Sequence, residues 1–148
     1  MLIRPKLEYA ASVWDPHQQN QIDAIERIQK RAARFVANRH RNTSSVSSML
    51  SDLQWESLKQ RRQNIRLCLL YKIRKDAIKV TCPLLKLAVS RARRQETSHD
   101  QQLNFFTCSR EYRFQAFFPR TVRDWNKLPQ RAVSAPDVTA FRRALADL

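Results

Sequence analysis

The sequence predicts a mainly α-helical protein with a minor β element, and three observations support this prediction. Apolar residues recur every three or four positions through much of the chain, which is the spacing of one helix face. Prolines stand next to the ends of several of these segments, where helices tolerate them. The 148 residues are 43% hydrophobic and 28% charged. A chain of this length and composition can fold around a real core.

The N-terminal part, residues 1–80, is expected to be a bundle-like set of helices. A first helical segment lies between Pro5 and Pro16, and a short helix at 46–50 follows a cap at Ser44 or Ser45. The clearest amphipathic helix covers 19–37, with an apolar face of Ile22, Ile25, Ile28, Ala32, Phe35 and Val36. A long helix at about 55–75 directs a second apolar set toward the core, namely Leu58, Ile65, Cys68, Leu69 and Ile73.

The remaining sequence predicts a linker and a small α+β unit. Residues 81–102 contain Pro83 and a polar stretch from 90 onward, so they are interpreted as a linker that is exposed over 90–102. In the C-terminal unit, 103–148, two aromatic-rich segments at about 103–107 and 112–117 predict short strands. Two helices follow, one beginning at Pro119 and one over about 137–148.

Charge is the strongest functional signal. The chain has 28 Lys and Arg against 13 Asp and Glu, a formal net charge of +15, and Arg outnumbers Lys 20 to 8. Such an excess favours polyanionic partners, and arginine is the better bidentate phosphate ligand. Three clusters carry the basic residues proposed for RNA or DNA phosphates: Arg27, Lys30, Arg31 and Arg34; Lys59, Arg62 and Arg66; and Arg91, Arg93 and Arg94 in the linker.

Aromatic residues interleaved with arginine form a second, weaker signal. Six aromatics fall between Phe105 and Phe118, and Trp125 follows them. Exposed aromatic rings beside arginines can stack on single-stranded bases. The competing interpretation, which is favoured because small domains need their large side chains inside, is that these rings form the core of the C-terminal unit.

Several kinds of chemistry are not expected. The chain has no glycine, whereas average usage would give about ten, so phosphate loops built on glycine are excluded. Cys82, His99 and Cys108 are the only loose cluster of metal ligands, without a tight Cys pair. Asp15 and His17 flank Pro16 with no nucleophile to assist, so helix termination explains them better. No catalytic residue, metal or cofactor is therefore assigned.

Particular strings resemble the reverse transcriptases of non-LTR, LINE-type (jockey-like) retrotransposons, in the region after the palm. The strings occur in the family's order and cover nearly the whole chain: RPKLEYAASVWDP (4–16), IERIQKRAARFV (25–36), LQWESL (53–58), RR (61–62), LYKI (70–73), FFPRTVRDWNKLP (117–129), then Ala135, Pro136 and Phe141.

This resemblance implies a C-terminal piece of a larger protein, comprising thumb-side helices and the region beyond them. The family's palm, with its paired catalytic aspartates, would lie upstream, so the chain is expected to be truncated and inactive as a polymerase. The family also has glycine before Trp55 and often near residue 76, whereas this chain has Gln54 and Lys75-Asp76-Ala77. A side chain in a left-handed turn costs about 1 kcal/mol, so these turns are expected to be strained or altered.

The function expected from the sequence is non-catalytic binding of template RNA, primer or target DNA, in partnership with the missing reverse transcriptase core. The alternative is a helical protein-interaction or scaffold fragment with no role in nucleic-acid binding. No apolar run is long enough to cross a bilayer, so a membrane partner is not expected. An intracellular location, either nuclear or cytoplasmic, is expected instead.

Overall fold

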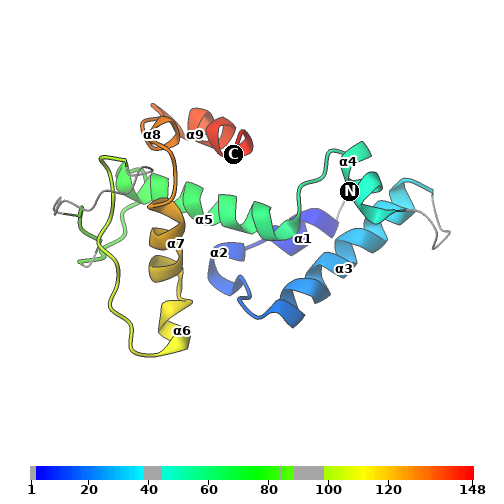
Figure 1. The fold of residues 1–148 in the computed structure, drawn as a ribbon, viewed down its shortest axis with the longest axis horizontal. Coiled ribbons are helices and arrows are strands. Elements are labelled where there is room, and N and C mark those ends of the chain that lie inside the picture. The colour runs from blue at the N-terminus through cyan, green and yellow to red at the C-terminus, as the bar shows by residue number, and fades with distance from the viewer. Residues whose placement is uncertain (1–2, 39–44, 84, 89–98) are drawn as a thin grey trace. The chain divides into compact units, whose positions relative to one another are not determined.

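The computed structural model describes residues 3–38, 45–83, 85–88 and 99–148, and it is mainly helical, as the sequence predicts (Figure 1). The chain divides into two compact units, Met1–Gln63 and Asn64–Leu148. None of the described helices is long and apolar enough to cross a membrane.

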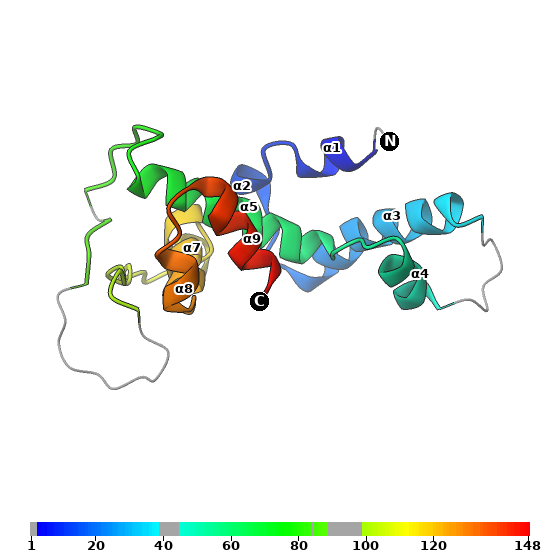
Figure 2. The ribbon, with the colours of Figure 1, turned by 90° about the horizontal axis from the view of Figure 1, so that it is seen from above.

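The first unit contains four helices and the beginning of a fifth. These are α1 (Ile3–Glu8), α2 (Ala11–Trp14), α3 (Gln19–Val36), α4 (Val46–Asp52) and the first residues of α5 (Leu58–Arg74). The helix predicted at 46–50 is confirmed as α4, which lies alongside α3 (Figure 2). Ser45 occupies the N-cap position, but its side chain makes no capping hydrogen bond.

The single helical segment predicted between Pro5 and Pro16 is broken in two at Ala10. This residue has φ 49° and ψ 27°, in the left-handed region, so the chain turns between α1 and α2. The indole Nε1 of Trp14 donates a hydrogen bond to the Tyr9 carbonyl at 2.6 Å, which closes the turn. Pro16 follows the end of α2 as predicted, whereas Pro5 lies inside the first turn of α1, and neither proline predicts the break at Ala10.

The helix predicted at 19–37 is confirmed as α3, but part of its predicted apolar face is wrong. Ile22 and Ala32 are buried as expected, whereas Ile28 is 42% exposed and Phe35 is 78% exposed. The buried face is rotated toward Gln29 and Ala33. The Gln29 side chain is buried, and its Nε2 donates to the Glu56 carbonyl at 2.9 Å, just before α5 begins, whereas its Oε1 has no hydrogen-bond partner among the described residues. One hydrogen bond thus compensates in part for the burial of a polar residue that hydrophobicity alone would place outside.

The second unit is built on the C-terminal part of α5. Its other helices are α6 (Glu111–Phe114), α7 (Phe117–Trp125), α8 (Gln130–Val133) and α9 (Val138–Ala146). The Tyr71 ring of α5 stacks on the Phe141 ring of α9, with centroids 4.6 Å apart, and Trp125 of α7 lies beside Phe141. Asp137 caps α9 by accepting a hydrogen bond from the Ala140 amide at 2.7 Å. These aromatic rings form the centre of the core.

The two short strands predicted in the C-terminal unit are wrong. Within the described residues there is no β-sheet, and pairing is limited to one antiparallel bridge between Leu87 and Leu103. Residues 112–114 belong to α6. Next to the bridge, the side-chain amide of Asn126 occupies the place of a neighbouring strand: its Oδ1 accepts from the Leu103 amide at 2.9 Å, and its Nδ2 donates to the Leu103 carbonyl at 2.8 Å.

The division between the units also differs from the predicted one. The sequence places the first part at 1–80 and a linker at 81–102, whereas the structure divides between Gln63 and Asn64, inside α5. The reason is that Leu67, Leu70 and Tyr71 pack in the same cluster as Trp125 and Phe141. Within the predicted linker, residues 84 and 89–98 lie outside the described residues, but Leu85 packs against the core and His99 is buried. Core packing therefore extends into the predicted linker at both of its ends.

Candidate nucleic-acid interface

Four predicted phosphate contacts follow one side of α3. Arg27, Lys30, Arg31 and Arg34 are spaced by three or four residues, so they point in similar directions from the helix. The first three side chains are exposed, and Arg34 is half-buried, with its Nε lacking a hydrogen-bond partner in the part of the chain that the structure describes. A contiguous row of accessible cations results.

The charge of this row is largely uncompensated. Among the described residues, neither Lys30 nor Arg31 has an ion pair or side-chain hydrogen bond, and Arg27 makes only a long contact of 3.4 Å to the Asp23 carbonyl. The acidic residues of α3 are engaged elsewhere. Asp23 accepts from Gln19 at 2.7 Å, and Glu26 accepts from the Lys59 backbone amide at 2.8 Å.

Lys59 joins this row through that last contact. Glu26 caps the beginning of α5, where a carboxylate interacts favourably with the helix dipole. The cap brings Lys59, whose side chain is exposed, against α3. We define the α3 surface as Arg27, Lys30, Arg31 and Lys59, with Arg34 at its edge. These are the predicted residues that the structure brings together.

Arg62 and Arg66 require a correction. The Arg62 side chain is 0% exposed, and its Nε donates to Asp15 Oδ1 at 2.8 Å; Arg66 is 4% exposed and bonds Asp124 Oδ2 at 3.0 Å. Buried guanidinium groups of this kind need a carboxylate partner, and here they tie distant segments together. In this conformation neither group is open to a phosphate, so both serve the fold. Sequence spacing alone does not separate such arginines from surface ones.

The third predicted cluster, Arg91, Arg93 and Arg94, lies outside the described residues.

The aromatic segment divides into inward and outward rings. Phe106 and Phe118 pack against the core of the second unit, with centroids 6.2 Å apart, as the core interpretation expects. Phe105 and Tyr112 are exposed. Arg123 covers the Phe114 ring at 3.7 Å, so that arginine and ring are already paired with each other. Phe105 and Tyr112 are therefore the two aromatic residues of this segment whose side chains are largely exposed.

The residues weighed for metal or acid–base chemistry have structural contacts. His99 is buried, with Nε2 3.0 Å from the Trp125 carbonyl, and Asp15 pairs with Arg62. In the described ranges no group of three or more His, Cys, Asp or Glu side chains could hold a metal ion.

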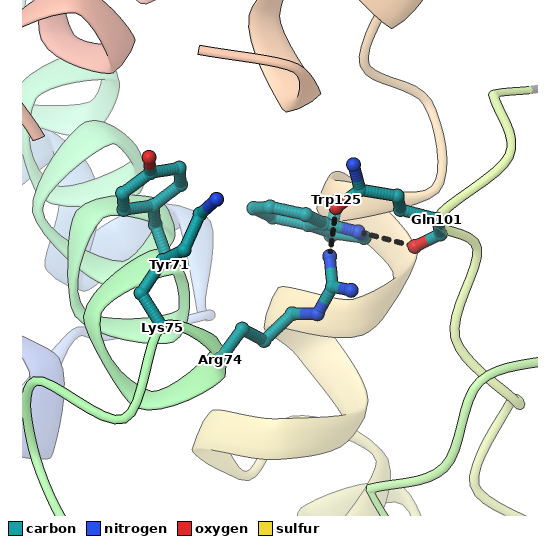
Figure 3. Close-up of a pocket in the computed structure, with 5 residues that line it drawn as sticks. All are labelled: Tyr71, Arg74, Lys75, Gln101 and Trp125. Atoms are coloured by element: carbon teal, nitrogen blue, oxygen red, sulfur yellow. Dashed lines mark hydrogen bonds between the residues drawn. The ribbon is translucent and has the colours of Figure 1, made fainter. Parts of the chain in front are cut away.

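One cavity contains cations to which the sequence assigned no role. Tyr71, Arg74 and Lys75 from the end of α5 line it together with Gln101 and Trp125 (Figure 3). Burial lowers the pKa of the Arg74 guanidinium, and the Asp100 carboxylate opposes that effect, but arginine stays protonated near neutral pH. The basic pair at the end of α5 is the sequence feature that could have indicated this cavity. Basic residues at a helix C-terminus are explained equally well by their favourable interaction with the helix dipole.

No protein-family model matches this chain, and neither a curated protein nor a solved structure matches it.

Proposed function

We propose that this protein is a non-catalytic nucleic-acid-binding segment whose α3 surface contacts phosphate groups of RNA or DNA. The observation that supports the proposal most is the pair Lys30 and Arg31, both exposed and both without a charge partner among the described residues. In a chain of net charge +15, such cations need not break an ion pair within the protein before they contact a phosphate, and their binding releases counterions from the nucleic acid.

We further propose that the chain is the C-terminal portion of a non-LTR retrotransposon reverse transcriptase. The basis is the set of strings in family order, from RPKLEYAASVWDP to FFPRTVRDWNKLP. On this proposal a missing core carries the polymerase chemistry, and the present chain holds template RNA, primer or target DNA. No polymerase activity is attributed to the chain itself.

The proposal makes a quantitative prediction about salt. Four phosphates neutralised by the α3 surface give a slope of log K against log salt of about −3.6 for duplex DNA and about −2.8 for a single strand. Filter binding of labelled RNA and DNA over a range of salt concentrations measures the slope. Binding that is absent at low salt, or insensitive to salt, contradicts the proposal.

Charge-reversal variants test whether the α3 surface is responsible for nucleic-acid binding. Lys30→Glu and Arg31→Glu are expected to weaken binding and to make the salt slope shallower, because each removes a phosphate contact. Lys79→Glu is the matched control, since Lys79 is exposed and outside the α3 surface, yet the change in net charge is the same. Equal losses in the Lys30 and Lys79 variants would show that net charge alone, and not this surface, drives binding.

The alternative, a helical protein-interaction fragment, is favoured by one observation. Ile28 and Phe35 are apolar but exposed on α3, beside its basic row. Such a strip can receive an amphipathic helix of a partner. On this alternative the chain binds neither RNA nor DNA at low salt, Phe35→Ser releases the partner, and Lys30→Glu does not.

A further inference from the structure

The cavity at the end of α5 combines two cations with rigid walls. Arg74 and Lys75 reach it from α5, and Figure 3 shows the Lys75 ammonium between the rings of Tyr71 and Trp125. The Arg74 guanidinium carbon lies 5.0 Å from the centre of the Trp125 ring, and the Lys75 nitrogen lies 5.8 Å from the centre of the Tyr71 ring. Both cations thus stand against aromatic surfaces with their charges directed toward one space.

The walls of the cavity are held by hydrogen bonds. The Tyr71 hydroxyl donates to the Ala135 carbonyl at 2.8 Å, and the Trp125 Nε1 donates to the Gln101 carbonyl at 3.0 Å. The Gln101 side-chain oxygen accepts from Arg74 Nη1, also at 3.0 Å. The side chains are therefore positioned before any ligand arrives, which lowers the entropic cost of binding.

Most of the donors at the cavity remain available. Gln101 uses one of the N–H groups of Arg74, and no other described residue accepts a hydrogen bond from Arg74 or from the Lys75 ammonium. The nearest acidic influence on Arg74 is Asp100, an exposed carboxylate that shares hydrogen bonds with Gln130. The negative end of the α5 dipole, worth about half a charge, does not balance two cations. Asp137 also acts on the Tyr71 hydroxyl, but neither Arg74 nor Lys75 forms an ion pair with a carboxylate among the described residues, so both cations are available to an anion.

The size and the walls indicate what kind of group fits. The cavity measures about 120 Å³, several times the room that one ordered water needs. The Trp125 ring is completely buried, so a nucleotide base has no open indole face to stack on. The available interactions are charge-assisted hydrogen bonds from a planar guanidinium and an ammonium, which suit a compact anion with several acceptor oxygens.

We propose that this cavity is a binding site for a single phosphate group, held by Arg74 and Lys75. The phosphate can come from a nucleic-acid backbone or from a free phosphate ion, because both present the same oxygens to the two cations. The site lies in the second compact unit, apart in sequence from the α3 surface, and does not depend on the function proposed above.

The test uses the full chain and inorganic phosphate as the probe. The indole N–H of Trp125 donates to the backbone carbonyl of Gln101, another residue that lines the cavity, so its two-dimensional proton–nitrogen NMR signal reports on changes at this site. We expect this signal to move with saturation as phosphate is added at constant ionic strength, while the indole signals of Trp14 and Trp55 stay in place. An unmoved Trp125 signal, or an equal shift of all three, would overturn the proposal.

A variant and its matched control locate the ligand contact. Lys75→Gln removes an exposed ammonium and is expected to weaken phosphate binding about tenfold or more, the usual effect of losing a charge-assisted hydrogen bond. Lys30→Gln changes net charge equally but lies on the α3 surface, and it is expected to leave the Trp125 titration within about twofold of the wild type. Equal weakening by the two variants would refute a site at Lys75.

A competition experiment distinguishes the two sources. If a short single-stranded oligonucleotide moves the Trp125 signal and phosphate competes with it, the site receives a backbone phosphate. If phosphate alone moves the signal, the site receives the free ion. Either result supports a phosphate site. Loss of nucleic-acid binding in Lys30→Glu with an intact Trp125 titration would show that the two proposals stand separately.

Discussion

At the scale of single residues, four helices are each followed by a residue in a conformation that glycine adopts most easily: Ala10 after α1, Asn38 after α3, Gln54 after α4 and Asp76 after α5. The last two, with φ 53° at Gln54 and φ 54° at Asp76, share one hydrogen-bond pattern. In each case two backbone hydrogen bonds close the helix end: from Gln54 to Ser51 and from Trp55 to Leu50, and likewise from Asp76 to Ile73 and from Ala77 to Lys72. This is the Schellman arrangement. The left-handed turn expected at Gln54 is confirmed, with a residue that bears a Cβ.

Gln54→Gly is therefore expected to stabilise the protein by about 1 kcal/mol, because glycine has no steric penalty at positive φ. Asp76→Gly should stabilise the protein less, since aspartate tolerates the left-handed region better than glutamine does. Urea denaturation followed by circular dichroism measures both. Gln21→Gly in α3 is the control and should cost about 1 kcal/mol, because there the backbone is helical. A destabilising Gln54→Gly would contradict the assigned turn.

At the scale of elements, the segment around Leu103 shows how an extended chain is held without a sheet. Gln102 and Asn104 share backbone hydrogen bonds with residues 88 and 86, at 2.8 and 3.0 Å, on one side. On the other side the Asn126 side chain satisfies both backbone groups of the buried Leu103. A buried peptide group left without a partner costs about 1–3 kcal/mol, so one side chain at the end of α7 replaces a strand.

Asn126→Asp is expected to destabilise the protein by about 1–3 kcal/mol, because a carboxylate cannot donate to the Leu103 carbonyl and repels it. Thermal or urea denaturation provides the measurement. Asn104→Asp makes the same chemical change at an exposed position in the same segment and should stay within about 0.5 kcal/mol of the wild type. If both substitutions cost the same, the Asn126 amide does not hold this segment.

At the scale of the whole molecule, two separate groups of buried residues share one helix. In the first unit α3 packs against α4 and α1, and it hydrogen-bonds to the Glu56 carbonyl and the Lys59 amide. In the second unit α5 contributes Tyr71 to the aromatic core. Damage to one core is therefore expected to leave the other mainly intact.

Phe141→Ala tests this expectation. Removing a completely buried phenylalanine costs about 3–5 kcal/mol, so amide hydrogen exchange should accelerate in α7, α9 and the C-terminal part of α5. Protection in α3 should change little. Loss of protection in α3 to the same degree would mean that the chain unfolds as one cooperative unit.

The sequence predicts the positions of several individual helices well. Periodicity locates α3 nearly to the residue, and Asp137 before an apolar run marks the start of α9. It does not predict that Arg62 is buried, because this depends on Asp15, which lies 47 positions away along the chain. It does not predict the replacement of a strand by Asn126 either, since an amide side chain carries no secondary-structure pattern.

The sequence by itself determined that this protein is helical and strongly basic, and where its principal helices lie, because helix periodicity and net charge are local or additive properties. Only the tertiary structure decided which cations face solvent. Packing buries Arg62 and Arg66 against carboxylates, leaves Lys30 and Arg31 open, and gathers Arg74 and Lys75 around one cavity. The physical reason is that the partner of each charge is set by contacts between segments far apart in the chain, which no local pattern records.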